Sequence, residues 1–294
     1  MNIGLIDVDG HNFPNLALMK ISAYHKSKGD NVEWCIPLLQ YDIVYQSKVF
    51  DKTYTPDITY TPLADKIIKG GTGYGLNNTL PYEIEHIYPD YSLYPKLTKD
   101  TAFGFLTRGC PRACDFCIVA KKEGRSSVKV ANLSEFWNGQ KYIKLLDPNL
   151  LACKEHKELL EQLAESKAYI DFTQGIDIRL TNEENIKLLN NVKTKVIHFA
   201  WDNSKDDLEK YFKNFDKFSN IKDYSRRKVY VLTNFNSTME ENLYRIYKLR
   251  ELNFDPYVMI YDKPNAPIEI RHLQRWVNNK FIFRSCEKFE DYRG

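Results

Sequence analysis

Short apolar runs alternate with segments of helical period from about residue 100 to the end of the chain. Each run is short enough to be a buried strand, and segments of roughly 8–15 residues with helical periodicity separate the runs. The predicted strands are residues 102–106, 143–146, 169–172, 196–200, 229–232, 257–260 and 281–283. This alternation predicts successive βα units and a parallel sheet, an α/β fold.

Several of the predicted helices have a recognisable start. A hydroxyl residue stands three positions before a carboxylate, just ahead of an apolar helical stripe, which is the pattern of a capping box. The three cases are Thr181 with Glu184, Ser204 with Asp207, and Ser237 with Glu240. We therefore predict that helices begin at these points.

The first 95 residues have a different pattern. Strands are predicted at residues 3–8, 31–36, 43–50 and 66–69, and a helix at residues 15–28. This arrangement predicts a small Rossmann-like module over residues 1–95, followed by a larger α/β domain over residues 96–294. Residues 81–99 are rich in Pro and Tyr without a clear period, so we expect them to link the two domains.

Composition changes this picture little. The chain has 294 residues, 43% hydrophobic and 28% charged, with a net charge of +3, which is typical of a globular protein and leaves the partner open. It contains no apolar run of about 20 residues and does not open with a signal-like segment. We expect a cytoplasmic protein without a membrane partner. In that compartment, six cysteines favour metal ligation or redox chemistry over a disulfide framework.

Three of the cysteines are clustered. Cys110, Cys114 and Cys117 have the spacing C-x3-C-x2-C, and the aromatic Phe116 precedes the last of them. Three thiolates at this spacing can bind three irons of a 4Fe-4S cluster and leave the fourth iron open to a small molecule. Zinc is the alternative, but zinc sites usually need a second Cys or His pair downstream, and this sequence has none.

At these residues the chain resembles the radical S-adenosylmethionine (SAM) superfamily. The resemblance implies a partial (β/α)6 barrel with the cluster loop directly after its first strand. It also implies SAM as a cofactor, cleaved reductively to a 5'-deoxyadenosyl radical, and a reductant such as flavodoxin or ferredoxin as a partner. The substrate is left open among small molecules, nucleic acids and proteins.

In parallel βα folds the reactive groups lie at the carboxyl ends of the strands, so the resemblance points to residues there as SAM contacts. The candidates that could bind SAM are Phe116 in the cysteine motif, Asp147 and Asn149 after the second strand, and Gln174, Asp177 and Arg179 after the third. An Asp-Pro turn explains Asp147 equally well, and capping and ion pairing explain the third group equally well. After the fourth strand, Trp201 and Asp202 are better site candidates than His198, which we expect to be a core residue.

The front module carries a partial resemblance to cobalamin-binding domains. Asp9, His11 and Pro14 follow the first strand, where those domains have D-x-H-x-x-G with the histidine as a cobalt ligand. A glycine-rich segment over residues 70–75 stands where a loop lining the cofactor would be. Because Pro14 replaces the glycine and the module is short, cobalamin stays an alternative, and so does a cobalamin-dependent radical SAM methyltransferase. The further alternative is an iron-sulfur electron-transfer protein that does not cleave SAM.

Overall fold

The computed structural model describes residues 1–10 and 12–294 and divides the chain into two compact units. The first unit is Met1–Gly104 together with Ala131–Ile143, and the second is Phe105–Val130 together with Lys144–Gly294. The sequence analysis placed a single boundary at residues 95 and 96. The structure instead divides the chain after Gly104 and returns it to the first unit for one further segment.

The first unit is built on a parallel sheet of four strands in the order β2-β1-β3-β4. Its elements are β1 (Asn2–Asp7), α1 (Leu16–Ser27), β2 (Asn31–Trp34), β3 (Tyr41–Ser47) and β4 (Ala64–Gly70). All five predicted elements are confirmed within a few residues. Helix α1 begins where expected because the Asn15 side chain caps it by accepting from the amide of Leu18 at 3.2 Å.

The prediction of a linker over residues 81–99 is wrong. These residues form α2 (Tyr82–Glu85), a 3-10 turn (Tyr91–Leu93) and α3 (Pro95–Thr98), and they pack on the first unit. Ile84 lies in one apolar cluster with Ile3 and Leu18. Asp90 accepts a hydrogen bond from the Ser22 hydroxyl at 2.7 Å. Helices of a single turn have no period to read, so contacts distant in sequence hold this segment in place.

The larger sheet has six strands in the order β12-β11-β10-β9-β8-β5, so each strand lies beside the next strand of the predicted βα series. The strands are β5 (Thr101–Gly104), β8 (Tyr142–Leu145), β9 (Tyr169–Phe172), β10 (Thr194–Ala200), β11 (Arg227–Thr233) and β12 (Asp255–Ile260). The pairs from β9 to β12 are parallel. The prediction of an α/β fold with parallel sheets is confirmed.

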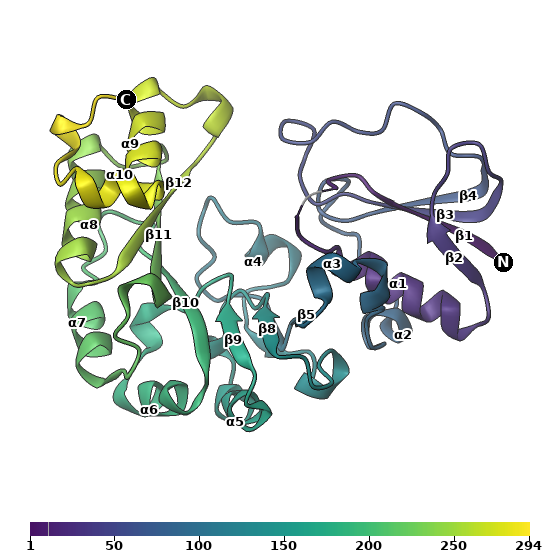
Figure 1. Ribbon diagram of the computed structural model, residues 1–294, viewed down its shortest axis with the longest axis horizontal. Coiled ribbons are helices and arrows are strands. Elements are labelled where there is room, and N and C mark those ends of the chain that lie inside the picture. The colour runs from purple at the N-terminus through teal and green to yellow at the C-terminus, as the bar shows by residue number, and fades with distance from the viewer. Residues whose placement is uncertain (11) are drawn as a thin grey trace. The chain divides into compact units, whose positions relative to one another are not determined.

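Helices follow the strands of the second unit and lie along one side of its sheet (Figure 1). They are α5 (His156–Ser166), α6 (Glu183–Asn191), α7 (Glu209–Phe218), α8 (Met239–Glu251), α9 (Ile268–Asn278) and α10 (Lys280–Ser285). Alternation along β10 explains the arrangement, because Phe199 faces the rings of Phe212 and Phe215 on α7 while its neighbour His198 faces the other way, against Tyr230.

Two helix starts lie one residue later than predicted, and one lies elsewhere. Asn182 caps α6, and Thr238 caps α8 in a capping box with Glu241. Helix α7 begins at Glu209 without a side-chain cap, and Ser204 donates instead to Glu241 at 2.9 Å. Adjacent polar residues compete for a cap, and the local pattern does not decide between them.

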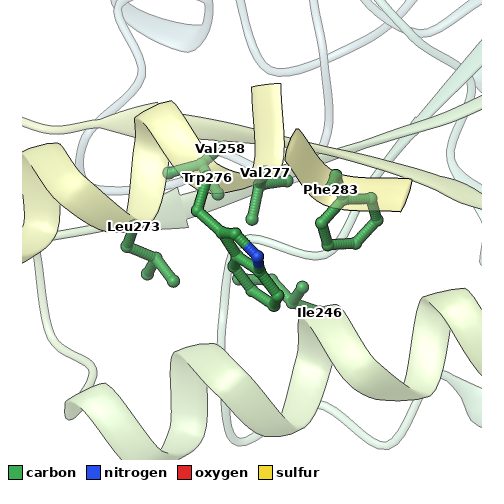
Figure 2. Close-up of a cluster of buried hydrophobic side chains, with 6 residues drawn as sticks. All are labelled: Ile246, Val258, Leu273, Trp276, Val277 and Phe283. Atoms are coloured by element: carbon green, nitrogen blue, oxygen red, sulfur yellow. The ribbon is translucent and has the colours of Figure 1, made fainter. Parts of the chain in front are cut away.

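The strand predicted at residues 281–283 is a helix, α10. The side chain of Asn279 accepts from the amides of Phe281 and Ile282 and so starts the helix. Phe283 then packs edge-on against Trp276, with ring centroids 5.0 Å apart. Figure 2 shows this apolar cluster, which consists of Ile246, Val258, Leu273, Trp276, Val277 and Phe283. Three consecutive apolar residues suit either structure, and here the cap and the cluster favour the helix.

Across the described residues, no helix combines the length and the apolar character that crossing a membrane requires.

Candidate functional site

The cysteine loop, residues 108–117, leaves the short strand β6 (Thr107–Arg108), which pairs antiparallel with β7 (Val128–Lys129). Gly109 has a φ of +84°, and a Cβ at this position would lie 2.2 Å from the carbonyl oxygen of Ser126. Only glycine fits there, because both the backbone angle and the close approach exclude a side chain. The loop therefore turns sharply just before Cys110.

Glu123 fastens the start of the cysteine loop. One of its carboxylate oxygens accepts from Nη1 of Arg108 at 2.8 Å, and the other accepts from the amide of Gly109 at 3.3 Å. The amide of Cys110 donates to the carbonyl of Gly124 at 3.1 Å. Glu123 follows α4 (Val119–Lys122), so the segment after the last cysteine folds back on the segment before the first.

Asp147 also holds the cysteine loop, from the end of β8. Its Oδ1 accepts from the amides of Leu106 at 3.2 Å and Thr107 at 2.6 Å, and from the Thr107 hydroxyl at 2.8 Å. Burial raises the pKa of Asp147 to about 6, although the hydrogen bonds from Thr107 and Leu106 oppose this rise. The Asp147 carboxylate, a candidate SAM contact, thus binds the protein's own backbone, and the residue is 5% exposed.

Asn149 lies against the first cysteine of the motif. Its Nδ2 donates to Sγ of Cys110 at 3.6 Å, and its backbone carbonyl accepts from the Ser127 hydroxyl at 2.9 Å. The residue is 2% exposed, and its Oδ1 is buried without a hydrogen-bond partner among the described residues. Among the described residues, Asn149 is therefore the predicted candidate that donates a hydrogen bond to a cysteine of the motif.

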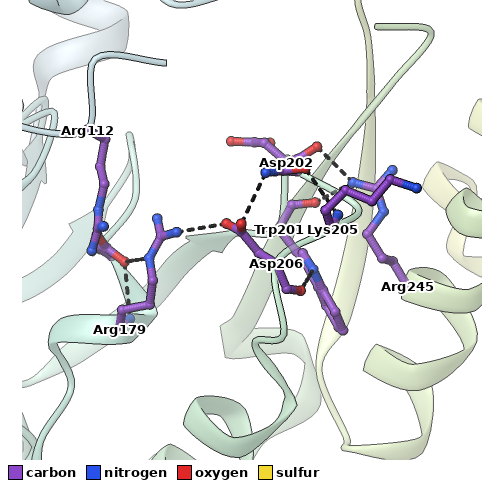
Figure 3. Close-up of polar contacts among 9 residues, drawn as sticks. Arg112, Arg179, Trp201, Asp202, Lys205, Asp206 and Arg245 are labelled. Atoms are coloured by element: carbon purple, nitrogen blue, oxygen red, sulfur yellow. Dashed lines mark hydrogen bonds and ion pairs between the residues drawn. The ribbon is translucent and has the colours of Figure 1, made fainter. Parts of the chain in front are cut away.

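Asp177 joins the cysteine loop to the loop after β9. Its carboxylate pairs with Nε of Arg112 and accepts from Nε of Arg179 at 2.8 Å, and Arg179 in turn donates from Nη1 to Asp206 at 2.8 Å. Figure 3 shows this line of charges. Asp177 and Arg179 are thus brought to the cysteine loop as ion-pair partners, whereas Gln174 is exposed.

Aromatic rings extend the site toward β11 and β12. Phe116 meets Phe235 at a ring distance of 5.7 Å, and Phe235 meets Tyr261 at 4.9 Å. Asn234, with a φ of +61°, donates from Nδ2 to the carbonyl of Tyr261 at 2.8 Å. Phe235 and Tyr261 were not among the individual candidates, although the loops after these two strands were expected at the site. Their position directly after a predicted strand was the available signal.

The residues after β10 have separate roles. Trp201 is 1% exposed and donates from Nε1 to the carbonyl of Asp206 at 3.0 Å, so it is a core residue rather than a site residue. Burial raises the pKa of Asp202 to about 6, with the Arg245 charge opposing. Arg245, also missed, is buried and donates to the carbonyls of Trp201 and Asp202 at 2.6 and 3.0 Å (Figure 3).

His198 is the core residue that the sequence predicts. It is 8% exposed, stacks on Tyr230 at 5.1 Å, and its Nδ1 lies 3.1 Å from the carbonyl of Phe172. Burial lowers its pKa.

The thiols of the motif influence one another. Burial raises the pKa of Cys114, and the charges of Asp202, Cys117 and Cys110 raise it further. Burial likewise raises the pKa of Cys117. Over residues 1–10 and 12–294, no group of three or more His, Cys, Asp or Glu side chains is gathered in the arrangement of metal ligands. Cluster ligation by these cysteines therefore stays a prediction.

The residues that resemble a cobalamin-binding motif are used within the first unit. Asp9 accepts from the amides of Val49 and Phe50. A Cβ at Gly71 would lie 2.2 Å from the carbonyl oxygen of Lys48, so this glycine allows two backbone segments to pack together. His11, the predicted cobalt ligand, lies outside the described residues, and cobalamin binding stays a prediction.

Comparisons with known proteins give little. No protein-family model matches the chain, and a search of curated proteins finds no match. Among solved structures, the chain is similar to a radical S-adenosylmethionine methyltransferase, TsrM, from Kitasatospora setae, with cobalamin and a 4Fe-4S cluster bound. The TM-score is 0.42 and the identity 11%, over 87% of this chain and 66% of that chain. Similarity at this level carries no argument about function.

Proposed function

We propose that this protein is a radical SAM enzyme whose 4Fe-4S cluster is held by Cys110, Cys114 and Cys117. In this proposal the six-stranded sheet and its helices form the partial (β/α)6 barrel that the motif resemblance implies. The consecutive order of the strands supports that topology. When bound, the cluster supplies an open iron for SAM and the electron that cleaves it reductively.

One observation carries the proposal. The cysteine loop lies across the carboxyl ends of several strands, with Cys110 against Asn149 after β8, Arg112 against Asp177 after β9, and Phe116 against Phe235 after β11. In parallel α/β proteins this edge of the sheet is where ligands bind and reactions take place. A loop whose only role was to bind a structural ion would not need contacts to three separate strand ends.

Contacts that hold the cysteine loop support the proposal of a cluster with a SAM molecule beside it. Gly109 and Glu123 hold the turn directly before Cys110, and Asp147 fixes Leu106 and Thr107 ahead of that turn. The Oδ1 of Asn149 is buried and accepts no hydrogen bond from the described residues, so Asn149 keeps a free acceptor beside the first cysteine. Phe116 offers a ring for nonpolar contact with the cofactor.

The test is anaerobic reconstitution with iron and sulfide, followed by incubation with SAM and dithionite in place of the biological reductant. We expect a cluster on the wild type and the release of 5'-deoxyadenosine and methionine. Cys114→Ala should lose both products. Cys153→Ala is the matched control, because Cys153 is buried and bonds to Glu155 rather than belonging to the motif.

Other outcomes would change the assignment. A cluster whose reduced EPR signal does not respond to SAM would indicate an electron-transfer protein. Stoichiometric zinc without iron would indicate a zinc-binding module. Retention of added cobalamin through gel filtration, together with SAM cleavage, would indicate a cobalamin-dependent methyltransferase.

A further inference from the structure

We infer that Asn149 sets the reduction potential of the cluster by donating a hydrogen bond from its side-chain amide to the sulfur of Cys110. The inference rests on the proposed function, since it requires a cluster on the three cysteines. It assigns Asn149 as a positioning residue that acts through the thiolate of Cys110, in addition to any contact with SAM.

The contact is held on both sides. Nδ2 of Asn149 lies 3.6 Å from Sγ of Cys110, which is within hydrogen-bond range for a sulfur acceptor. The buried Ser127 hydroxyl donates to the backbone carbonyl of Asn149 at 2.9 Å. The 3-10 turn Leu150–Ala152 begins directly after Asn149 and fixes the backbone on that side. The amide is therefore placed by the fold.

The orientation of the amide matches an acceptor. A cluster-bound thiolate has lone pairs and no proton, so only the NH2 group of an asparagine can bond to it. In the structure the NH2 group faces the sulfur, while Oδ1 is buried with no hydrogen-bond partner in the described part of the chain. The reverse orientation would direct the amide oxygen at the thiolate and cause repulsion.

The consequence for the potential follows from charge. Reduction adds one negative charge to the cluster and its thiolates, and a donor hydrogen bond stabilises the more negative state more strongly. Asn149 is 2% exposed, so water does not screen this interaction. Removal of the donor should therefore make the cluster harder to reduce.

Two substitutions test this. Asn149→Leu keeps a similar size without a donor, and Asn149→Asp keeps the shape but places a carboxylate oxygen against the sulfur. Asn185→Leu is the matched control, because Asn185 is a buried asparagine of α6 that donates to the carbonyl of Leu180. Each protein is reconstituted without SAM, its iron content and circular dichroism are recorded, and its cluster is titrated under EPR detection.

For Asn149→Leu we expect the ratio of reduced to oxidised cluster to fall about tenfold at a fixed potential, which is about 59 mV for a one-electron couple. Asn149→Asp should lower the reduction potential further, and Asn185→Leu should leave the reduction potential unchanged. If Asn149→Leu retains no cluster, Asn149→Asp decides the question. A wild-type potential in an Asn149 variant with full iron content would overturn the inference alone. A wild type without any cluster would overturn the proposed function as well.

Discussion

Asp147→Asn is the substitution whose effect can be worked out most completely. Oδ1 of Asp147 accepts from two backbone amides and from the Thr107 hydroxyl, whereas Oδ2 accepts from the Leu106 amide at 3.1 Å. An asparagine can place its carbonyl oxygen at the Oδ1 position and keep the three bonds to that atom, while its NH2 group at the Oδ2 position loses the bond from the Leu106 amide. The substitution therefore removes a buried negative charge while keeping the cysteine loop in place.

The magnitude follows from the pKa of the buried carboxyl group. Burial raises the pKa of Asp147 from its usual 3.8 to about 6, a difference of about two units, which corresponds to about 3 kcal/mol. Because the pKa of Asp147 in the folded state lies above its unfolded value, the contribution of the protonated carboxyl group to stability is complete below pH 3.8. This contribution is lost as the pH rises through about 6. Asparagine does not titrate, so the variant lacks this loss.

The assay is urea unfolding of the apoprotein, wild type and Asp147→Asn, between pH 4.5 and 7.5. The variant should gain stability relative to the wild type as the pH rises, by about 2 kcal/mol over this range. Asp202, whose pKa burial also raises to about 6, is present in both proteins and cancels in the comparison. A difference that stays constant with pH would refute the reasoning.

Three further predictions concern the cysteine loop, the ion pair between buried Arg227 and half-exposed Asp216, and the core. Gly109→Ala should abolish iron binding, because the new Cβ would lie 2.2 Å from a backbone carbonyl oxygen. Gly124→Ala is the control and should keep the iron, since Gly124 has a similar φ but a Cβ there would have no atom within 4 Å. The iron content of both variants is measured after reconstitution. Arg227→Met should leave the free energy of unfolding unchanged or raise it, since Nε and Nη2 of this fully buried arginine have no hydrogen-bond partner among the described residues. Asp216→Ala should lower the free energy of unfolding by about 2 kcal/mol, because it removes the carboxylate that pairs with Arg227. Urea unfolding of both variants tests the two expectations, and a large loss of stability in Arg227→Met would contradict the first. Trp276→Ala should lower the free energy of unfolding by about 4 kcal/mol because it empties the centre of the cluster in Figure 2, and a loss below about 1 kcal/mol in urea unfolding would show that the cluster closes over the gap.

Local patterns were enough to predict most elements of the fold. The strands of the larger sheet were found from short apolar runs, and α1 was predicted at residues 15–28, close to its observed bounds. The wrong predictions lie where the local pattern is short. Residues 281–283 fit a strand or a helix equally, and the cap from Asn279 decided the outcome. Adjacent polar residues shifted two helix starts by one position, since each of them could serve as a cap.

The candidate site was predictable only in part. The spacing of the three cysteines is a local property, and so is the position of Asn149 after a strand. The sequence did not show that Asp147 binds backbone amides about 40 positions earlier in the chain, or that Phe235 would meet Phe116. Arg245 was missed because a charged residue within a helix reads as solvent-exposed, whereas here it binds carbonyls after β10.

The sequence by itself therefore determined the succession of βα units and the cysteine motif, because periodicity and ligand spacing are properties of neighbouring residues. Tertiary structure alone decided which polar side chains hold the cysteine loop and which of them stay unpaired. Strand pairing brings loops far apart in sequence to one edge of the sheet, and there a carboxylate or an amide bonds to whichever donor or acceptor the fold places within about 3 Å.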